Sequence, residues 1–301
     1  MNQRLAKSDP AARAAQRAAA LTCWSGPVEP EVLSGGLTNH NFVVHDRGES
    51  FVVRIADDIP LHGIMRFNEL ASSRAAYAAG VSPEVIHAEP GALVMRFIEG
   101  TTYGEAEVRA AHGAGRIVPL IQRVHREIPK YFEGPALIFW VFQVARGYAR
   151  TLRAGDSRMT GELPRFLEIN AKLEAALGPV EIIFGHNDLL AANFIDDGKR
   201  LWLVDWDYGG FNGPLFDLAN LASNNQFSPV EEDQLLEDYF ETPASDELRH
   251  KLSATKCASL LRESMWSMVS EIHLDIDFDY VAYTTENLAR FERAYADFKA
   301  G

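Results

Sequence analysis

His186-Asn187-Asp188-Leu189-Leu190-Ala191-Ala192-Asn193 is the stretch that decides the fold. This polar turn follows the apolar run Ile182–Phe184 and places an aspartate five residues before an asparagine. The apolar run Leu201–Val204 comes next and ends at Asp205. Short apolar runs separated by polar turns predict a loop, a strand, a turn and a second strand. The two strands would carry Asn193 and Asp205 on opposite sides of one hairpin.

The spacing H-x-D-L-x-x-x-N from His186 to Asn193 is similar to that of the catalytic loop of kinases. There, a carboxylate such as Asp188 accepts or orients the proton of a hydroxyl, and an amide oxygen such as that of Asn193 faces Mg²⁺ on the phosphates of ATP. Asp205 would supply a second hard oxygen ligand. Asp188 alone could cap a turn and Asn193 alone could begin a strand. The whole set on one predicted hairpin favours phosphoryl transfer with ATP and Mg²⁺.

Outward from this hairpin the chain divides into two parts. Residues 1–99 read as a lobe built from a helix and an antiparallel sheet, because they hold most of the predicted strands. The predicted elements are a helix over Ala11–Ala20, a hairpin of Asn41–His45 with Phe51–Ile55, a helix over Arg66–Ala79 ended by Gly80, and a strand over Ala92–Ile98.

Residues 100–301 are mostly helical in pattern and carry the catalytic hairpin. The sequence therefore predicts an α+β protein with two lobes. The predicted helices are Glu105–His125 broken at Pro119, Phe139–Arg153, Leu163–Leu177, Val230–Tyr239, Ser245–Met268 and Tyr283–Phe298.

The net charge, the cysteine count and the lengths of the apolar runs limit the partners and the compartment that are expected. The 301 residues carry a net charge of −13, which argues against nucleic acid and anionic membranes as partners. The two cysteines, Cys23 and Cys257, cannot form a disulfide framework, and a reducing cytoplasm is expected. No uncharged apolar run is long enough to predict a membrane span. The sequence is compatible with a monomer or a homodimer.

The block from His186 to Asn220 resembles the choline/ethanolamine kinase family, within the aminoglycoside phosphotransferase and protein-kinase-like superfamily. The likeness rests on His186–Asn193, on Asp205-Trp-Asp-Tyr208 and on Asn212-Gly-Pro-Leu-Phe-Asp217-Leu-Ala-Asn220. It implies a kinase-like bilobal fold with a small antiparallel-sheet N-lobe and a mostly helical C-lobe. It also implies that Asp188 is the catalytic base and that Asn193 and Asp205 bind magnesium.

The resemblance assigns further roles near these residues. Asp207 would assist metal binding or only orient Asp205. It is also expected to line the substrate site. Asp217 would hold the backbone of the catalytic loop, since a carboxylate in an apolar run needs backbone donors.

ATP binding is expected in the first lobe. The loop Ser34-Gly35-Gly36-Leu37-Thr38-Asn39 resembles the family's phosphate-covering loop, although Gly-Gly with polar residues is more often a simple hairpin turn. Arg54 stands where protein kinases have a lysine, so it would clamp the phosphates, with Glu69 holding it. The alternative is that Arg54 is an ordinary arginine on an exposed face of the strand. Phe97 lies in the segment Met95–Glu99 that would meet adenine.

For the acceptor, aromatic faces and carboxylates are the groups that bind an ammonium. Trp266 and Tyr283 match positions of the family's choline pocket, but both could also be helix-packing residues. Glu263 stands where eukaryotic members often have a Trp, and Asn224 where they often have a Glu. A carboxylate in place of an aromatic ring favours a primary ammonium, as in ethanolamine, or another amino alcohol.

Three functions are therefore compared. The first is an ATP- and Mg²⁺-dependent kinase of choline, ethanolamine or a related amino alcohol. The second is a kinase of the same fold that acts on an aminoglycoside or a sugar-like alcohol, which residues His186–Asp205 cannot distinguish. The third is a non-catalytic nucleotide-binding protein, which the presence of base, metal ligands and strand cation argues against.

Overall fold

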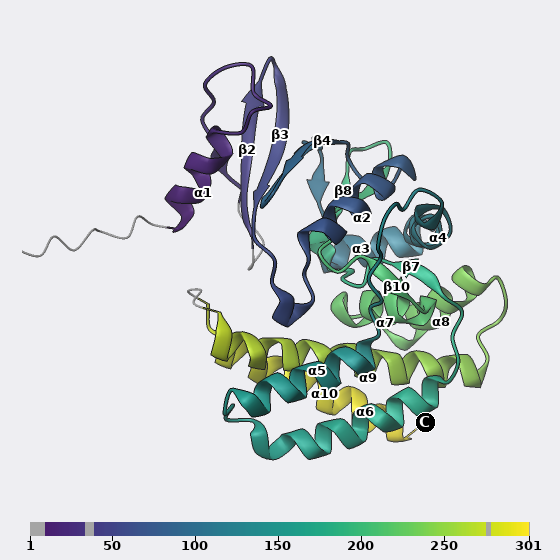
Figure 1. Ribbon diagram of the computed structural model, residues 1–301. Helices are drawn as coiled ribbons and strands as arrows, with labels where there is room; N and C mark the ends of the chain where they lie inside the picture. The colour runs from purple at the N-terminus through teal and green to yellow at the C-terminus, as the bar shows by residue number, and fades with distance from the viewer. Residues whose placement is uncertain (1–9, 34–38, 275–277, 301) are drawn as a thin grey trace, which may run out of the picture.

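The computed structural model describes residues 10–33, 39–274 and 278–300 (Figure 1). Its first part is a five-stranded antiparallel sheet in the order β1-β2-β3-β5-β4. The strands are β1 (Glu31–Val32), β2 (His40–Asp46), β3 (Glu49–Ile55), β4 (Val85–Glu89) and β5 (Ala92–Arg96).

The β2–β3 hairpin follows from local sequence. Arg47 and Gly48 both have positive φ angles, 51° and 77°, which is the backbone of the tight two-residue turns that suit twisted hairpins. Phe42, Val44, Phe51 and Val53 alternate with less buried residues and face one side. Helix α1 (Pro10–Ala19) covers that side with Ala14 and Ala18, forming a small core.

Helix α2 (Arg66–Ala78) connects this sheet to the rest of the protein. Its residues Ala75 and Ala76 belong to the larger hydrophobic core, together with the helices that follow. Helix α2 also contacts strand β4 of the sheet (Figure 1). The helix therefore packs with the second part of the chain although it lies between β3 and β4 in sequence.

The second part is mainly helical. Helices α5, α6, α9 and α10 run side by side at the base of the molecule, and α7 packs on α9 (Figure 1). The helices are α3 (Glu105–Gly113), α4 (Ile117–Glu127), α5 (Val141–Ala154), α6 (Leu163–Leu177), α7 (Pro214–Asn224), α8 (Pro229–Phe240), α9 (Asp246–His273) and α10 (Tyr280–Ala300).

Short strands carry the chain through the centre. β8 (Phe194–Asp196) pairs with β9 (Leu201–Leu203) and with β6 (Thr101–Thr102), all antiparallel. β7 (Ile183–Gly185) pairs with β10 (Gly210–Asn212). These strands bring the two ends of the His186–Asp205 region together between the sheet and the helices.

Three details differ from the sequence prediction. The helix expected over Glu105–His125 is two helices, and the break is at Gly115 with φ of 69° rather than at Pro119. Pro119 lies in the first turn of α4, where a backbone N–H has no intrahelical partner and proline is tolerated. Strand β4 and helix α7 were not predicted.

The α+β class, with a small antiparallel sheet followed by a mostly helical part, is confirmed. A lobe boundary at residue 99 stays a prediction. Within residues 10–33, 39–274 and 278–300, no helix has the length and apolar character that crossing a membrane requires.

Candidate active site

The loop His186–Asn193 leaves β7 and is held from below by α7. The carboxylate of Asp217, in the first turn of α7, accepts the backbone N–H of His186 at 2.8 Å and that of Asn187 at 2.7 Å. Asn220, one turn later, accepts the N–H of Leu189 at 2.5 Å. Asp217 is 1% exposed, so its charge needs these donors. This is the contact that the sequence predicted for Asp217.

Two residues of this region have a left-handed backbone conformation. One is Asn187, which directly precedes Asp188, and the other is Asp205 itself. Asn187 has φ of 66° and Asp205 has φ of 71°, a region that asparagine and aspartate tolerate better than other side chains. The buried side chain of Asn187 donates to the carbonyl of Tyr208 at 2.9 Å. This bond ties the loop that carries Asp188 to the segment that carries Asp205.

Asn193 and Asp205 come together through the β8–β9 hairpin. Phe194 is paired with Leu203, and the N–H of Val204 donates to the carbonyl of Asn193 at 3.0 Å. The Asn193 amide nitrogen donates to the carbonyl of Asp188 at 2.9 Å, which leaves the amide oxygen available. An amide oxygen and a carboxylate are hard ligands that fit Mg²⁺.

This pair also fits the number of protein ligands that Mg²⁺ takes. Among the described residues, no three His, Cys, Asp or Glu side chains are placed to share a metal ion. Mg²⁺ in nucleotide sites is commonly bound by one or two protein groups, with phosphates and water completing the shell. The Asn193–Asp205 pair would hold such an ion on the phosphates of a bound nucleotide.

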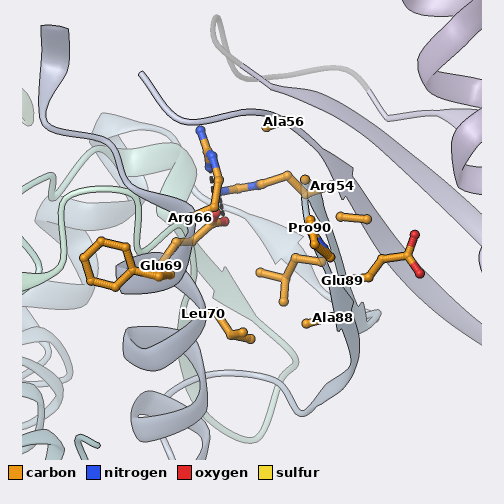
Figure 2. A pocket seen from close by; sticks show the side chains of 12 residues that line it. Arg54, Ala56, Arg66, Glu69, Leu70, Ala88, Glu89 and Pro90 are labelled. Carbon is orange, nitrogen blue, oxygen red and sulfur yellow. Dashed lines mark hydrogen bonds and ion pairs between the residues drawn. The ribbon is translucent and has the colours of Figure 1, made fainter. Parts of the chain in front are cut away.

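Arg54 of β3 is not an exposed surface residue. It is 7% exposed, and its Nη1 donates to Glu69 at 2.7 Å and to Asp205 at 2.9 Å. The same nitrogen lies 3.0 Å from Asp207. Figure 2 shows Arg54 reaching from the sheet to Glu69 of α2, with Arg66 converging on the same place.

Arg66 is the second cation of this cluster. Its Nη1 donates to Glu69 at 2.6 Å and to Asp207 at 2.8 Å, and its Nη2 donates to the Asn39 side-chain oxygen at 3.0 Å. Asn39 in turn donates to Asp207 at 3.1 Å. Asp207 is thus engaged by two arginines and an amide, while Asp205 pairs with one arginine, Arg54, and is 28% exposed along its side chain.

A hollow of about 290 Å³ lies between the sheet and the β8–β9 hairpin; we name it the sheet-side hollow. It brings together the predicted residues Arg54, Phe97, Asn193 and Asp205. Glu69 is reached through Arg54 and does not line it. Ser34, Gly35, Gly36 and Thr38 lie outside the described residues.

A second hollow, of about 210 Å³, lies between the catalytic loop and α9; we name it the helix-side hollow. Asp205 lines both hollows, so they meet at this carboxylate. All five residues expected on the substrate side line the second one: Asp188, Asp207, Glu263, Trp266 and Tyr283.

Glu263 is fixed by two donors in the wall of the helix-side hollow. The hydroxyl of Tyr283 donates to Oε1 at 2.8 Å, and Nη1 of Arg262 donates to Oε2 at 2.9 Å. Arg262 is 3% exposed and lies over the ring of Tyr208, 4.4 Å from its centroid. The helix-side hollow is therefore lined by a buried cation as well as by acidic and aromatic side chains.

Three neighbouring carboxylates differ in their affinity for protons. Burial raises the pKa of Asp188 to about 8, with Glu263 adding to the effect and Arg262 opposing it. Burial and the charge of Asp205 raise the pKa of Asp207 to about 6. For Asp205, burial acts upward, but the Arg54 cation outweighs it and lowers the pKa. Asp205 is thus the carboxylate most ready to bind a metal, and Asp188 the one most ready to exchange a proton.

Sequence reasoning missed two residues of this site, Arg66 and Arg262. Arg66 precedes Glu69 by three positions at the start of α2, a spacing that forms ion pairs on a helix face. Arg262 stands beside Glu263 in an otherwise apolar part of α9, between Leu261 and Met265. A charged pair in an apolar run was the available signal, because such groups must have buried partners.

Comparison with known proteins agrees with this geometry. The profile of the phosphotransferase enzyme family matches residues 29–252, and the chain therefore belongs to this family. Protein LicA of Haemophilus influenzae is 31% identical over 217 residues, which are 68% of this chain. The chain spans 61% of the length of that relative.

Two further proteins are similar to this chain over most of its length. A probable ethanolamine kinase of Arabidopsis thaliana is 25% identical over 287 residues, which are 84% of this chain and 76% of that protein. The crystal structure of a choline/ethanolamine kinase family protein from Mesorhizobium loti has a TM-score of 0.75 and 28% identity, covering 96% of this chain and 99% of that one. The resemblance to the choline/ethanolamine kinase family and the kinase-like bilobal fold are confirmed.

Proposed function

We propose that this protein transfers the γ-phosphoryl group of ATP to the hydroxyl of a small amino alcohol such as ethanolamine or choline, with Mg²⁺ as the metal. The observation that carries the proposal is the meeting of two hollows at Asp205. One hollow has the cation and metal-ligand set for a triphosphate. The other has Asp188 beside an acidic and aromatic lining.

In the proposed reaction, the acceptor hydroxyl oxygen attacks the γ-phosphorus. A new P–O bond forms, and the bond from the γ-phosphorus to the bridging oxygen breaks, so that ADP leaves with that electron pair. Asp188 takes the hydroxyl proton. Its raised pKa suits this task, because a base that exchanges protons near neutral pH is close to the working pH.

Arg54 and Asn193–Asp205 would act on the nucleotide side. Arg54 would face the phosphates once its carboxylate partners turn to the metal, with Glu69 keeping the guanidinium in place. Asn193 and Asp205 would hold Mg²⁺, which supplies positive charge against the developing negative charge on the phosphates. The role of Asp207 would be to pair with Arg54 and Arg66.

The acceptor is expected to be small and cationic. Asp207 and Glu263 supply negative charge, and the faces of Trp266 and Tyr283 can attract an ammonium. A volume of about 210 Å³ is below the roughly 300–1,000 Å³ of sites for drug-sized ligands, which disfavours an aminoglycoside. Glu263, fixed by two donors, favours a primary ammonium that can itself donate hydrogen bonds.

A panel assay tests this function. Ethanolamine, its N-methylated series up to choline, 3-aminopropanol and an aminoglycoside would each be supplied with ATP and Mg²⁺. ADP release and the phosphate ester would both be measured. We expect one of the amino alcohols to be the best acceptor. ADP release with the aminoglycoside alone, or with none of the panel, would refute the proposal.

Asp188→Asn is the matched control, since it keeps the shape of the side chain and removes the base. We expect turnover to fall about 10²–10⁴-fold while the affinity for ATP stays similar. Thermal shifts with ATP separate catalysis from simple binding. Stabilisation by ATP that ignores Mg²⁺, with no turnover, would favour the non-catalytic alternative.

A further inference from the structure

The segment between β3 and α2 reaches away from the sheet and into the helical part. In Figure 1 this part of the chain descends from the sheet to the level of α5 and α9. Ile59 and Ile64 close it as a small loop, with their N–H groups donating to each other's carbonyls at 2.8 Å and 3.2 Å. His62 stands at its tip, in the 3₁₀ turn Pro60–His62, and is 3% exposed.

His62 is inserted between α5 and α9. Its Nδ1 lies 3.1 Å from the hydroxyl of Tyr148 on α5, and its Nε2 lies 3.2 Å from the hydroxyl of Ser270 on α9. Its ring lies over Trp266, with centroids 5.1 Å apart and planes 35° from parallel. His62 does not line either hollow, whereas Trp266 lines the helix-side hollow.

The donor and the acceptor of each of these hydrogen bonds can be assigned. The hydroxyl of Ser270 donates to the carbonyl of Trp266 at 2.9 Å, so its oxygen must accept from His62 Nε2–H. His62 Nδ1 then accepts from the hydroxyl of Tyr148. Burial lowers the pKa of His62 to about 3, so the ring is neutral and keeps this tautomer at any ordinary pH. A chain of three hydrogen bonds thus runs from α5 through the loop to the backbone of Trp266.

Trp266 depends on such support because its indole has no polar anchor of its own. Its Nε1 is buried without a hydrogen-bond partner within the part of the chain that the structure describes. Its other ring neighbours, Tyr280 and Tyr283, meet it at 62° and 81°. The imidazole of His62 is therefore the ring that lies closest to parallel with the indole.

We propose that His62 is a positioning residue that fixes the indole of Trp266, so that a residue from the sheet side of the molecule sets the affinity for the acceptor amine without touching it. This inference rests on the proposed acceptor site. The loop of His62 begins after Arg54 and ends before Arg66. The segment that supports the acceptor side thus lies between the two arginines that pair with Glu69 and Asp207.

His62→Ala is the main test, with His112→Ala as the matched control. His112 is also a buried histidine, 2% exposed, with its ring stacked on Phe227 at 5.0 Å and its Nε2 3.2 Å from the carbonyl of Glu231. We expect His62→Ala to raise the KM for the acceptor about tenfold and to leave the KM for ATP unchanged, because the variant loses the ring contact with the indole and the two hydrogen bonds that hold His62 between α5 and α9. His112→Ala should leave both constants unchanged.

His62→Gln serves as the conservative variant, because its amide can still donate to Ser270. It should restore part of the acceptor affinity. The indole Nε1–H resonance of Trp266, in protein labelled with ¹⁵N-tryptophan and assigned with Trp266→Phe, gives a readout that does not depend on turnover. It should shift in His62→Ala and stay in place in His112→Ala.

The two possible failures are distinguishable. An absence of turnover with every amino alcohol in the wild-type protein would refute the proposed function, and the Trp266 resonance would then decide the positioning role alone. An acceptor KM within twofold of wild type in His62→Ala, with the resonance unmoved, would overturn the role of His62. Equal rises in both KM values would overturn it as well, since they indicate general loosening.

Discussion

Replacing Asp217 by asparagine should loosen the catalytic loop from beneath. The substitution keeps the size of the side chain and removes its charge. In the native protein, Oδ2 accepts from the N–H of His186 at 2.8 Å and lies 2.9 Å from Nε2 of His125. Oδ1 accepts from the N–H of Asn187 at 2.7 Å. An amide has one acceptor oxygen, so one of these two sides must face an NH₂ group.

The magnitude follows from counting these bonds. If the amide oxygen takes the place of Oδ2, the N–H of Asn187 loses a charge-assisted bond worth about 1.5–3 kcal/mol. The two bonds that remain become neutral, which weakens each by roughly 0.5–1 kcal/mol. We therefore expect Asp217→Asn to lower the free energy of unfolding by about 2.5–5 kcal/mol, which overlaps the range for breaking a buried charged contact.

The Asp217→Asn substitution should also lower kcat. Asn187 directly precedes Asp188, and a displacement of about 1 Å at a reacting group can cost roughly 10²-fold in rate. Urea unfolding followed by tryptophan fluorescence and kcat for the best acceptor would measure the two effects. Asp233→Asn is the control, because its ion pair with Arg249 is 42–44% exposed and worth about 0–1 kcal/mol. A loss below 1 kcal/mol, with kcat within twofold of wild type, would refute the reasoning.

Three further predictions concern the hollows. Because burial raises the pKa of Asp188 to about 8, the carboxyl holds its proton at neutral pH, and kcat/KM for a quaternary acceptor that does not titrate should rise with pH, reach half of its maximum near pH 8 and level off above that pH. Arg262→Met should move that rise to higher pH, since the guanidinium favours the ionised form; a flat profile would contradict this. Glu263→Gln should raise the KM for a primary amine about tenfold, a change of about 1.4 kcal/mol, and that for choline less; equal changes would argue against a role in selecting the ammonium. Asp205→Ala should abolish the part of the ATP-induced thermal shift that needs Mg²⁺, as EDTA should in the wild type, and an unchanged shift would exclude Asp205 as a ligand.

Much of the fold could be predicted because local signals agreed with the final structure. The β2–β3 hairpin was foreseen from alternating apolar residues, and α6 was found with its bounds Leu163–Leu177. Helix α7 was not predicted, although Pro214 stands at its first position, where proline is favourable. Its buried face is decided by contacts with α9, which no local pattern records.

The site was predictable where residues are close in sequence or fixed by a known spacing. Asp188, Asn193 and Asp205 fall on one hairpin, so their meeting followed from the strands. Arg66 and Arg262 each have a carboxylate close in sequence, but the contacts that place them in the site, with Asp207 and Tyr208, come from far along the chain. Asp207 is 141 residues from Arg66, and no periodicity predicts that pair.

The ion pairs of Arg54 join two bodies that have separate hydrophobic interiors. Arg54 is carried by β3, whose apolar residues pack in the small core with α1, whereas Glu69 is carried by α2, which packs its Ala75 and Ala76 with the helical part. The Arg54–Glu69 contact therefore links the small core to the helical part. It does so beside Asp205, the carboxylate at which the two hollows meet.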